Sequence, residues 1–388
     1  MDPEDFSNSG TGRLIRAPTG YYAFVPGSLP RDLNYTADVV QVLSLADRKV
    51  GNLEGLCRRL PNPHLLSGAY VGREAVLSSR IEGTQSTQSD LYLFEIDPEE
   101  KLYPPDIREV HNYVLALYYA LKRLETLPLS LRFLRELHER LMQEVRGADK
   151  TPGQFRTSQN WIGGRTPTDA RFVPPPVPEM NEALDDFEKF LHRENPGKIP
   201  PLIECALLHY QFESIHPFLD GNGRLGRLLI AVLAIQRGCL SQPLLYLSEY
   251  FEINREEYYN QLHDVSRTGE WDSWLVFFLK GVAEQADDAI RRAHLVLDIC
   301  DRYKRLDLPP AAQRLVEILM QNPYVKIKWV AERLKVSHPT ATKAVSRLEQ
   351  LGVLTPVPQN KRRGQLFVAK ELLDAFTKDM TSSASQSV

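Results

Sequence analysis

The chain has 388 residues, of which 43% are hydrophobic and 25% charged, and its formal net charge is −3. This composition is typical of a soluble globular protein with two or three hydrophobic cores. The longest apolar run, residues 228–235, is too short to cross a membrane, and the acidic start of the chain lacks the pattern of a signal peptide. Four separated cysteines without zinc spacing indicate reduced thiols in a cytoplasmic protein: Cys57, Cys205, Cys239 and Cys300.

Helical periodicity extends from about residue 33 to residue 305 and predicts a mainly α fold. A Gly/Pro/Ser-rich segment precedes it, and proline-containing stretches at 61–63 and 103–105 interrupt it. The first helical region ends at the sequence Ser78-Ser-Arg-Ile-Glu-Gly83. By itself, this ending predicts a helix that stops at Gly83 and leaves Glu82 in solvent.

Residues 153–164 and 172–176 together predict a β-hairpin. Their aromatic and β-branched residues are bounded by glycines, and the prolines at 174–176 forbid a following helix. One interpretation is an ordinary surface hairpin. The other is a flap whose exposed edge holds a peptide by strand addition.

The segment from His216 to Arg227 reads His-Pro-Phe-Leu-Asp-Gly-Asn-Gly-Arg-Leu-Gly-Arg, and it lies between apolar helical runs at 201–215 and 225–235. Its glycines allow positive φ angles that turn backbone N–H groups inward. The dipole and the free N–H groups at a helix N-terminus bind anions. The segment therefore predicts a phosphate site, although its composition also fits a glycine-rich turn with surface charges.

Each polar side chain of this segment suits a nucleotide polyphosphate. Arg224 and Arg227 are three residues apart, on one helix face, and can both hold phosphate oxygens. Asp220 offers a hard oxygen ligand for Mg²⁺, and the Asn222 amide can donate to charge on a transferred phosphoryl group. His216 titrates near neutral pH and can take a proton from an attacking hydroxyl.

A linker at 306–310 precedes a C-terminal region of different charge. Residues 311–370 contain eleven Lys/Arg and three Asp/Glu, a net charge of +8, so the rest of the chain carries −11. The pattern predicts a winged helix-turn-helix with helices at 312–320, 327–334 and 340–351, a turn at 336–339, and strands at 353–356 and 364–368 around a basic loop at 361–363.

In this interpretation residues 341–347 form the recognition helix and Lys361–Arg363 the tip of the wing. The side chains that can reach phosphates or base edges are Thr340, Thr342, Lys343, Ser346 and Arg347. Winged helices also serve as protein-interaction and dimerisation modules. DNA is therefore one of two kinds of partner that this region suits.

The segment 216–227 matches the signature of the Fic family, His-Pro-Phe-x-Asp/Glu-Gly-Asn-Gly-Arg-x-x-Arg, at every specified position. The resemblance implies a helical core that transfers AMP from ATP to a Ser, Thr or Tyr hydroxyl of a protein. It implies His216 as general base, Asp220 as Mg²⁺ ligand, and a phosphate cradle formed by Gly221, Asn222, Gly223, Arg224, Leu225, Gly226 and Arg227. The related Doc branch, which phosphorylates its target, has lysine at the position of Gly223.

Three further segments resemble the same family. Residues 153–176 resemble its β-hairpin flap, which implies that the nucleotide lies beneath Asn160, Trp161, Ile162 and Gly163. Tyr258 and Tyr259 resemble its adenine-pocket pair, with Ser266 where relatives often have Asn, although a tyrosine pair on a helix is also typical of half-buried packing. Residues 17–26 resemble the N-terminal arm of stand-alone Fic proteins.

The sequence from Ser78 to Gly83 resembles the inhibitory motif Ser/Thr-x-x-x-Glu-Gly/Asn of class II Fic proteins. The resemblance implies that Ser78, Glu82 and Gly83 form an inhibitory helix end, in which Glu82 pairs with Arg227 where the γ-phosphate would bind. Because a carboxylate repels phosphate, ATP would then bind in a pose in which its α-phosphorus cannot be attacked in line. We expect the enzyme as encoded to be largely inactive.

We therefore expect three regions: an N-terminal region at 1–105 with the inhibitory helix, a Fic core at 106–305, and a winged helix at 311–375. The expected activity is that of an autoinhibited protein adenylyltransferase that uses ATP and Mg²⁺ and modifies itself as well as a protein target. Homodimers are common in this family. Two alternatives are retained: a DNA-binding regulator whose Fic core senses nucleotide, and removal of AMP at the same site. The complete motif favours the transferase, because a sensor would not require the base at His216.

Overall fold

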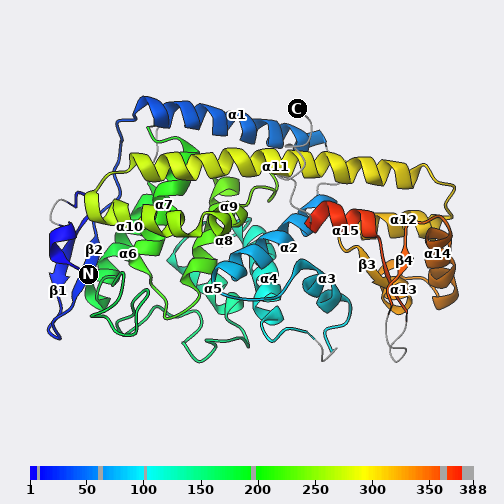
Figure 1. The fold of residues 1–388 in the computed structure, drawn as a ribbon, viewed down its shortest axis with the longest axis horizontal. Coiled ribbons are helices and arrows are strands. Elements are labelled where there is room, and N and C mark those ends of the chain that lie inside the picture. Colours follow the sequence, from blue (N-terminus) through cyan, green and yellow to red (C-terminus); the bar gives the residue numbers. More distant parts are fainter. Residues whose placement is uncertain (7–8, 60–63, 100–102, 194–197, 359–364, 378–388) are drawn as a thin grey trace.

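The computed structural model shows a mainly helical protein in which one long helix extends along most of the molecule (Figure 1). It describes residues 1–388 except 7–8, 60–63, 100–102, 194–197, 359–364 and 378–388. The N-terminal part contains the 3-10 helix η1 (Pro3–Phe6), strands β1 (Gly12–Arg16) and β2 (Tyr22–Pro26), and helices α1 (Ala37–Arg59), α2 (His64–Ile81) and α3 (Gln88–Ile96).

The remaining elements follow in two groups. The central group is α4 (Ile107–Leu124), α5 (Leu131–Leu141), α6 (Val177–His192), α7 (Pro201–Ile215), α8 (Asn222–Gln236), α9 (Ser248–Ile253), α10 (Arg255–Thr268) and α11 (Asp272–Lys304). The C-terminal group is α12 (Pro310–Leu319), β3 (Tyr324–Lys326), α13 (Ile327–Leu334), α14 (His338–Gln350), β4 (Thr355–Pro356), β5 (Leu366–Val368) and α15 (Lys370–Thr377). The mainly α prediction is confirmed.

Helices α7 and α8 form the centre of the molecule. Both are apolar on nearly all sides and are buried along most of their length, as expected for helices that other helices surround. A proline at the first turn of α7 fits its start, because that position needs no N–H donor. The short connection between α7 and α8, residues 216–221, is the first half of the segment singled out above.

The long helix α11 joins the central group to the N-terminal one. Helix α1 lies alongside it over most of its own length (Figure 1). On another face of α11, the buried Trp274 donates from Nε1 to the Ala206 carbonyl on α7 at 3.1 Å. Helix α1, predicted only as part of a helical region, therefore packs on the same long helix that supports α7.

The C-terminal domain contacts the two helices on either side of Glu82. Asn322 Nδ2 donates to the Tyr92 carbonyl on α3 at 2.9 Å, and Lys326 Nζ lies 2.9 Å from Asp97 just beyond that helix. Arg73 on α2 donates to the Phe376 carbonyl on α15 at 3.3 Å. The segment that carries Glu82 is thus bounded by elements held against the C-terminal domain.

The flap region differs from the predicted hairpin. Its strand pairing is reduced to one antiparallel bridge, between Ile162 and Phe172. Two consecutive glycines with φ of 69° and 76°, Gly163 and Gly164, turn the chain immediately after the first bridge residue. Prolines at 174–176 lack the N–H group that a longer ladder requires.

The C-terminal domain has the predicted order of three helices and two strands, with β3 and α15 in addition. Strands pair antiparallel in the order β3-β5-β4. The predicted turn is two residues shorter, because the Ser337 hydroxyl accepts from Thr340 N at 3.4 Å and begins α14 at His338. The predicted wing tip, 361–363, and the interruption at 61–63 lie outside the described residues. In the described ranges, no helix combines the length and apolar character needed to cross a membrane.

Candidate functional site

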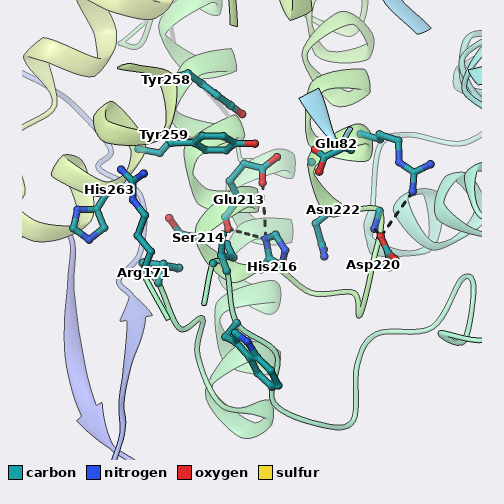
Figure 2. Close-up of a pocket in the computed structure, with 18 of the residues that line it drawn as sticks. Glu82, Arg171, Glu213, Ser214, His216, Asp220, Asn222, Tyr258, Tyr259 and His263 are labelled. Atoms are coloured by element: carbon teal, nitrogen blue, oxygen red, sulfur yellow. Dashed lines mark hydrogen bonds and ion pairs between the residues drawn. The ribbon is translucent and has the colours of Figure 1, made fainter. Parts of the chain in front are cut away.

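A cavity of about 540 Å³ opens beside the connection between α7 and α8. Figure 2 shows His216 next to Glu213, with Glu82 and the tyrosines of α10 near the same opening. The predicted residues that line the cavity are Glu82, Trp161, Ile162, Gly163, His216, Asp220, Gly221, Asn222, Gly223, Arg224, Arg227, Tyr258, Tyr259 and Ser266. The chain folds these side chains, which are far apart in sequence, around one space.

The N-terminus of α8 faces this cavity through Gly221, Asn222 and Gly223. Gly221 has a φ of 77°, which turns the chain into the helix, and no side chain caps this helix start. The first backbone N–H groups of a helix have no partner within it, so this terminus suits an anion. A Cβ at Gly223 would lie 2.3 Å from Glu82 Oε1, so the absence of a side chain allows Glu82 to approach the helix.

Glu82 lies over this terminus and forms an ion pair with Arg227. The distance from Glu82 Oε1 to Arg227 Nη2 is 2.7 Å, and Arg227 also donates from Nε to the Ser78 hydroxyl and from Nη2 to the Ser78 carbonyl, both at 2.9 Å. Burial acts to raise the pKa of Glu82, but the Arg227 guanidinium holds it below its usual value overall. The pair is therefore fully charged at neutral pH. Gly83, with a φ of 95°, ends the segment without lining the cavity.

His216 ends α7 in a left-handed conformation with φ of 48°. Its carbonyl accepts hydrogen bonds from Arg156 Nε at 3.1 Å and Asn160 Nδ2 at 3.2 Å, and these contacts stabilise a conformation that is unusual for a residue with a side chain. Burial lowers the pKa of the imidazole to about 4, with a smaller opposing effect of the Glu213 carbonyl. The ring is neutral at pH 7 and can accept a proton.

Two asparagines have structural contacts in place of the ligand contacts predicted for them. The Asn222 amide bonds to Phe218 at both ends, with Oδ1 accepting from Phe218 N at 2.9 Å and Nδ2 donating to Phe218 O at 2.8 Å. Asn160 Nδ2 donates to the same carbonyl at 2.9 Å. Both side chains thus brace the loop, because its backbone groups need partners once they are buried.

Three cradle residues also differ from expectation. Arg224 donates from Nη1 to the buried Glu109 at 2.9 Å, so its guanidinium is paired with a carboxylate although it borders the cavity. Leu225 is fully buried in the core. Gly226 does not line the cavity, and a Cβ at this position would lie 2.2 Å from Glu213 Oε1. Helical geometry explains this, because only one face of α8 can border the opening.

Asp220 is the only residue of this segment with the chemistry of a Mg²⁺ ligand. Its side chain is 41% exposed, and Oδ1 accepts from Gly221 N at 2.6 Å. Among the described residues, no group of three or more His, Cys, Asp or Glu side chains is arranged to hold a metal ion. The donors present fit an ion whose other ligands are phosphate oxygens and water, as is usual for Mg²⁺ bound with a nucleotide.

The pair Tyr258 and Tyr259 shows features of both interpretations of the sequence, half-buried packing and a place at the nucleotide pocket. Tyr258 is buried, its hydroxyl lies 2.8 Å from His209 Nε2, and its ring stacks on Phe251 with centroids 4.3 Å apart. Tyr259 is half-buried, and both rings border the cavity. Ser266 Oγ lies 2.9 Å from the Tyr210 hydroxyl. Packing therefore fixes Tyr258, while Tyr259 has more of its ring available to a ligand.

The structure adds residues that the sequence did not single out, among them Arg146, Arg171, Glu213, Arg255 and His263. Glu213 had a detectable signal, since it precedes His216 by three residues and shares its helix face. His138 on α5 braces the loop from outside. Its Nδ1 accepts from Gly153 N at 2.9 Å, so Nε2 donates to the Asp220 carbonyl, also at 2.9 Å.

Comparison with known proteins agrees with this geometry. Residues 40–122 match the Fic/DOC family N-terminal region, and residues 128–234 match the Fic/DOC family. The chain therefore contains a Fic domain together with its N-terminal region. Residues 306–363 of this Fic protein match the MarR family, which agrees with the winged helix.

Curated relatives carry the name protein adenylyltransferase Fic. Those of Drosophila sechellia and Drosophila melanogaster are each 30% identical over 215 residues, which is 52% of this chain and 41% of the relative. The Fic protein described here therefore spans about two fifths of the length of these relatives.

Solved structures show the same fold. The crystal structure of a Fic family protein from Desulfovibrio desulfuricans aligns with a TM-score of 0.57 and 19% identity, over 87% of this chain and 97% of that one. A Fic domain containing signaling protein from Bacteroides thetaiotaomicron aligns with a TM-score of 0.50 and 20% identity, over 66% and 96% of the two chains.

The glycines at the two ends of α8 provide a test of the loop geometry in the Fic protein. Gly221 and Gly238 have similar φ values, 77° and 73°, but a Cβ at Gly221 would lie 2.7 Å from Met142 Sδ, whereas Gly238 has open space. Gly238→Ala should cost about 1–2 kcal/mol from backbone strain. Gly221→Ala should cost roughly 1–3 kcal/mol more, because it also overpacks the loop. Urea unfolding of both variants checks this, and equal losses would contradict the packing of Gly221.

Proposed function

We propose that this protein transfers AMP from ATP to a hydroxyl group of a protein, and that Glu82 inhibits the transfer. One observation carries the proposal: a neutral imidazole, that of His216, borders the same cavity as an uncapped helix N-terminus. The helix terminus suits the phosphates and the imidazole suits the proton of an incoming hydroxyl. The name of the curated relatives supports the same reaction.

In the proposed reaction the target hydroxyl attacks the α-phosphorus of ATP. A bond forms between the hydroxyl oxygen and that phosphorus, the bond from the α-phosphorus to the bridging oxygen of the β-phosphate breaks, and pyrophosphate leaves. His216 takes the hydroxyl proton. The backbone N–H groups of Asn222 and Gly223 stabilise the charge on the phosphates, and Arg227 pairs with the terminal phosphate. Mg²⁺ held by Asp220 would neutralise part of the polyphosphate charge.

The positions of the flap and the tyrosines support a role in binding. Trp161 lines the cavity and is 39% exposed as a residue, next to the single bridge pair of the flap. The exposed edge at this pair offers backbone groups to an extended segment of the target. Tyr259 offers a ring face for the adenine. A target segment bound to the flap would lie beside His216 because both border the same cavity.

Inhibition follows from the ion pair between Glu82 and Arg227. Since the guanidinium is already paired at 2.7 Å, the terminal phosphate must displace a carboxylate of like charge. Competition for one cation gives Glu82 control over the pose of the whole triphosphate.

Glu82→Gly should raise auto-AMPylation strongly, because Arg227 becomes free to bind phosphate. Intact mass after incubation with ATP and Mg²⁺ measures the added AMP groups. Glu125→Gly is a matched control, since Glu125 is an exposed carboxylate at the C-terminus of α4. Equal labelling of the parent and the Glu82 variant would contradict inhibition by Glu82, and no labelling of either would contradict the transferase activity.

His216→Ala in the Glu82→Gly background should lower the rate of AMP transfer by about 10²–10⁴-fold, the usual contribution of a general base. ATP binding should be retained, because the phosphates contact α8 and Arg227. Calorimetric titration with ATP and a transfer assay with labelled ATP separate the two effects. A variant that transfers AMP at the rate of its background would exclude His216 as the base.

A second candidate function, DNA binding by the C-terminal domain, is supported by the match to the MarR family and by the surface of α14. The buried face of this helix is apolar and comprises Ala341, Ala344, Val345 and Leu348. Thr340 and Lys343 are exposed on its other side. Arg347 donates to the Asp307 carbonyl at 3.0 Å and is partly committed to the linker.

If α14 contacts DNA, Lys343→Ala should weaken binding to duplex DNA and lower the slope of log affinity against log salt by about 1. The exposed Lys280 on α11 provides the control, since Lys280→Ala removes the same charge from a different helix. Fluorescence anisotropy over a salt series measures both. Absence of binding at low salt would make this domain a protein-interaction module instead.

A further inference from the structure

Glu213 is a further carboxyl group in the wall of the cavity, besides those of Glu82 and Asp220. It lies on α7, one turn before His216, and its side chain is 12% exposed. Its Oε1 atom is buried and has no hydrogen-bond partner among the described residues. A buried carboxyl oxygen without a partner is costly, so its retention beside a reactive histidine indicates a use.

The space for this carboxyl group comes from α8. A Cβ at Gly226 would lie 2.2 Å from Glu213 Oε1, so any side chain at position 226 would displace it. Gly226 has no contact with the cavity and needs no positive φ. The glycine is therefore explained by the room that it leaves for Glu213.

Two oxygens of Glu213 face one nitrogen of His216. The distance from His216 Nδ1 is 3.3 Å to the Glu213 carbonyl and 3.9 Å to carboxyl Oε2 (Figure 2). In the neutral ring the proton is favoured on Nδ1, because the Glu213 carbonyl can accept it in a hydrogen bond and the carboxyl oxygen lies close enough to attract it. Nε2 makes no hydrogen bond within the described part of the chain and is the nitrogen left to receive a proton.

The other groups that face Glu213 leave it without a cation of its own. Arg227 on α8 is paired with Glu82, and the hydroxyls of Tyr258 and Tyr259 on α10 are neutral at pH 7. Burial raises the pKa of Glu213 to about 7; Arg227 lowers it and Glu82 raises it. A positive charge that forms on His216 would therefore meet an unpaired carboxylate.

We propose that Glu213 is a positioning residue for His216, whose carboxylate keeps the imidazole proton on Nδ1 and stabilises the imidazolium that forms when Nε2 takes the proton of the target hydroxyl. This inference rests on the proposed transferase function. Glu213 acts through His216, and its distance from the ring suits a charge–charge interaction that strengthens as the imidazolium forms.

The kinetic test uses the Glu82→Gly protein as background. Glu213→Gln keeps the shape of the side chain and removes its charge, and Glu256→Gln, on the exposed side of α10, is the matched control. Initial rates of auto-AMPylation over a range of ATP concentrations should show a maximal rate lower by about 10-fold or more for Glu213→Gln, a part of the general-base contribution. The KM for ATP and the rates of Glu256→Gln should be unchanged.

The pH profile separates this role from packing. Glu213 acts when ionised, so the rate should fall as the pH decreases through the pKa of Glu213, near 7. In this background the ATP phosphates take the place of the negative charge of Glu82 beside Arg227. The pKa of Glu213, and with it the fall in rate, therefore stays near neutral pH. The rate of Glu213→Gln should not fall near pH 7, because the remaining titrating group, His216, has a lower pKa of about 4. A purely structural role would lower the rate without changing the profile.

A spectroscopic measurement of the His216 tautomer does not depend on AMP transfer. Histidine ¹⁵N shifts of the full chain, with the His216 signal assigned by its loss in His216→Ala, report the tautomer. The parent should show the proton on Nδ1, and Glu213→Gln should shift the population toward Nε2. An unchanged tautomer together with an unchanged pH profile would overturn the role of Glu213. Failure of the Glu82→Gly background to transfer AMP would instead overturn the proposed function, and the shifts would still decide the position of the proton.

Discussion

The site depends on how the chain passes between two buried helices in six residues. Helix α7 ends with His216 at φ of 48° and α8 begins after Gly221 at φ of 77°, so both ends of the loop are left-handed. Such a loop is stable only if its buried backbone groups have partners. Side chains from three places in the chain provide them: His138 on α5, Arg156 and Asn160 in the segment 153–164, and Asn222 at the start of α8.

This bracing explains why several polar residues near the site are structural. A side chain that holds the loop uses its hydrogen-bond donors on the loop backbone. Those donors are then not available to a ligand. Asn222 is an example, since both ends of its amide are bonded to Phe218. The backbone of the helix start, the His216 ring and the guanidinium of Arg227 are then the groups that the fold presents to the cavity.

The guanidinium of Arg227 and the carboxyl groups of Glu82 and Glu213 lie together in the wall of the cavity, which further arginines and Asp220 also line. Arg227 contacts Ser78 and Glu82, which belong to a segment more than a hundred residues earlier in the chain, while Glu213 comes from the helix that ends in His216. Burial raises the pKa of the Glu213 carboxyl group to about 7, and Arg227, which lowers it, is paired with Glu82. The segment with Glu82 is itself flanked by helices that contact the C-terminal domain. The electrostatics of the cavity therefore combine contributions from the N-terminal and central groups of helices.

The sequence by itself determined the helices α7 and α8, the loop between them and the winged-helix pattern, because these follow from local periodicity, glycine positions and caps. It also determined, through one resemblance, that Glu82 and Arg227 are candidates for a pair. Only the tertiary structure decided that the two lie 2.7 Å apart, that Arg224 is taken by Glu109, and that α1 packs along α11. It also reduced the flap to a single bridge. Local sequence encodes the direction of the backbone and the face of a helix, whereas the partner of a charged side chain depends on which distant helix packs beside it.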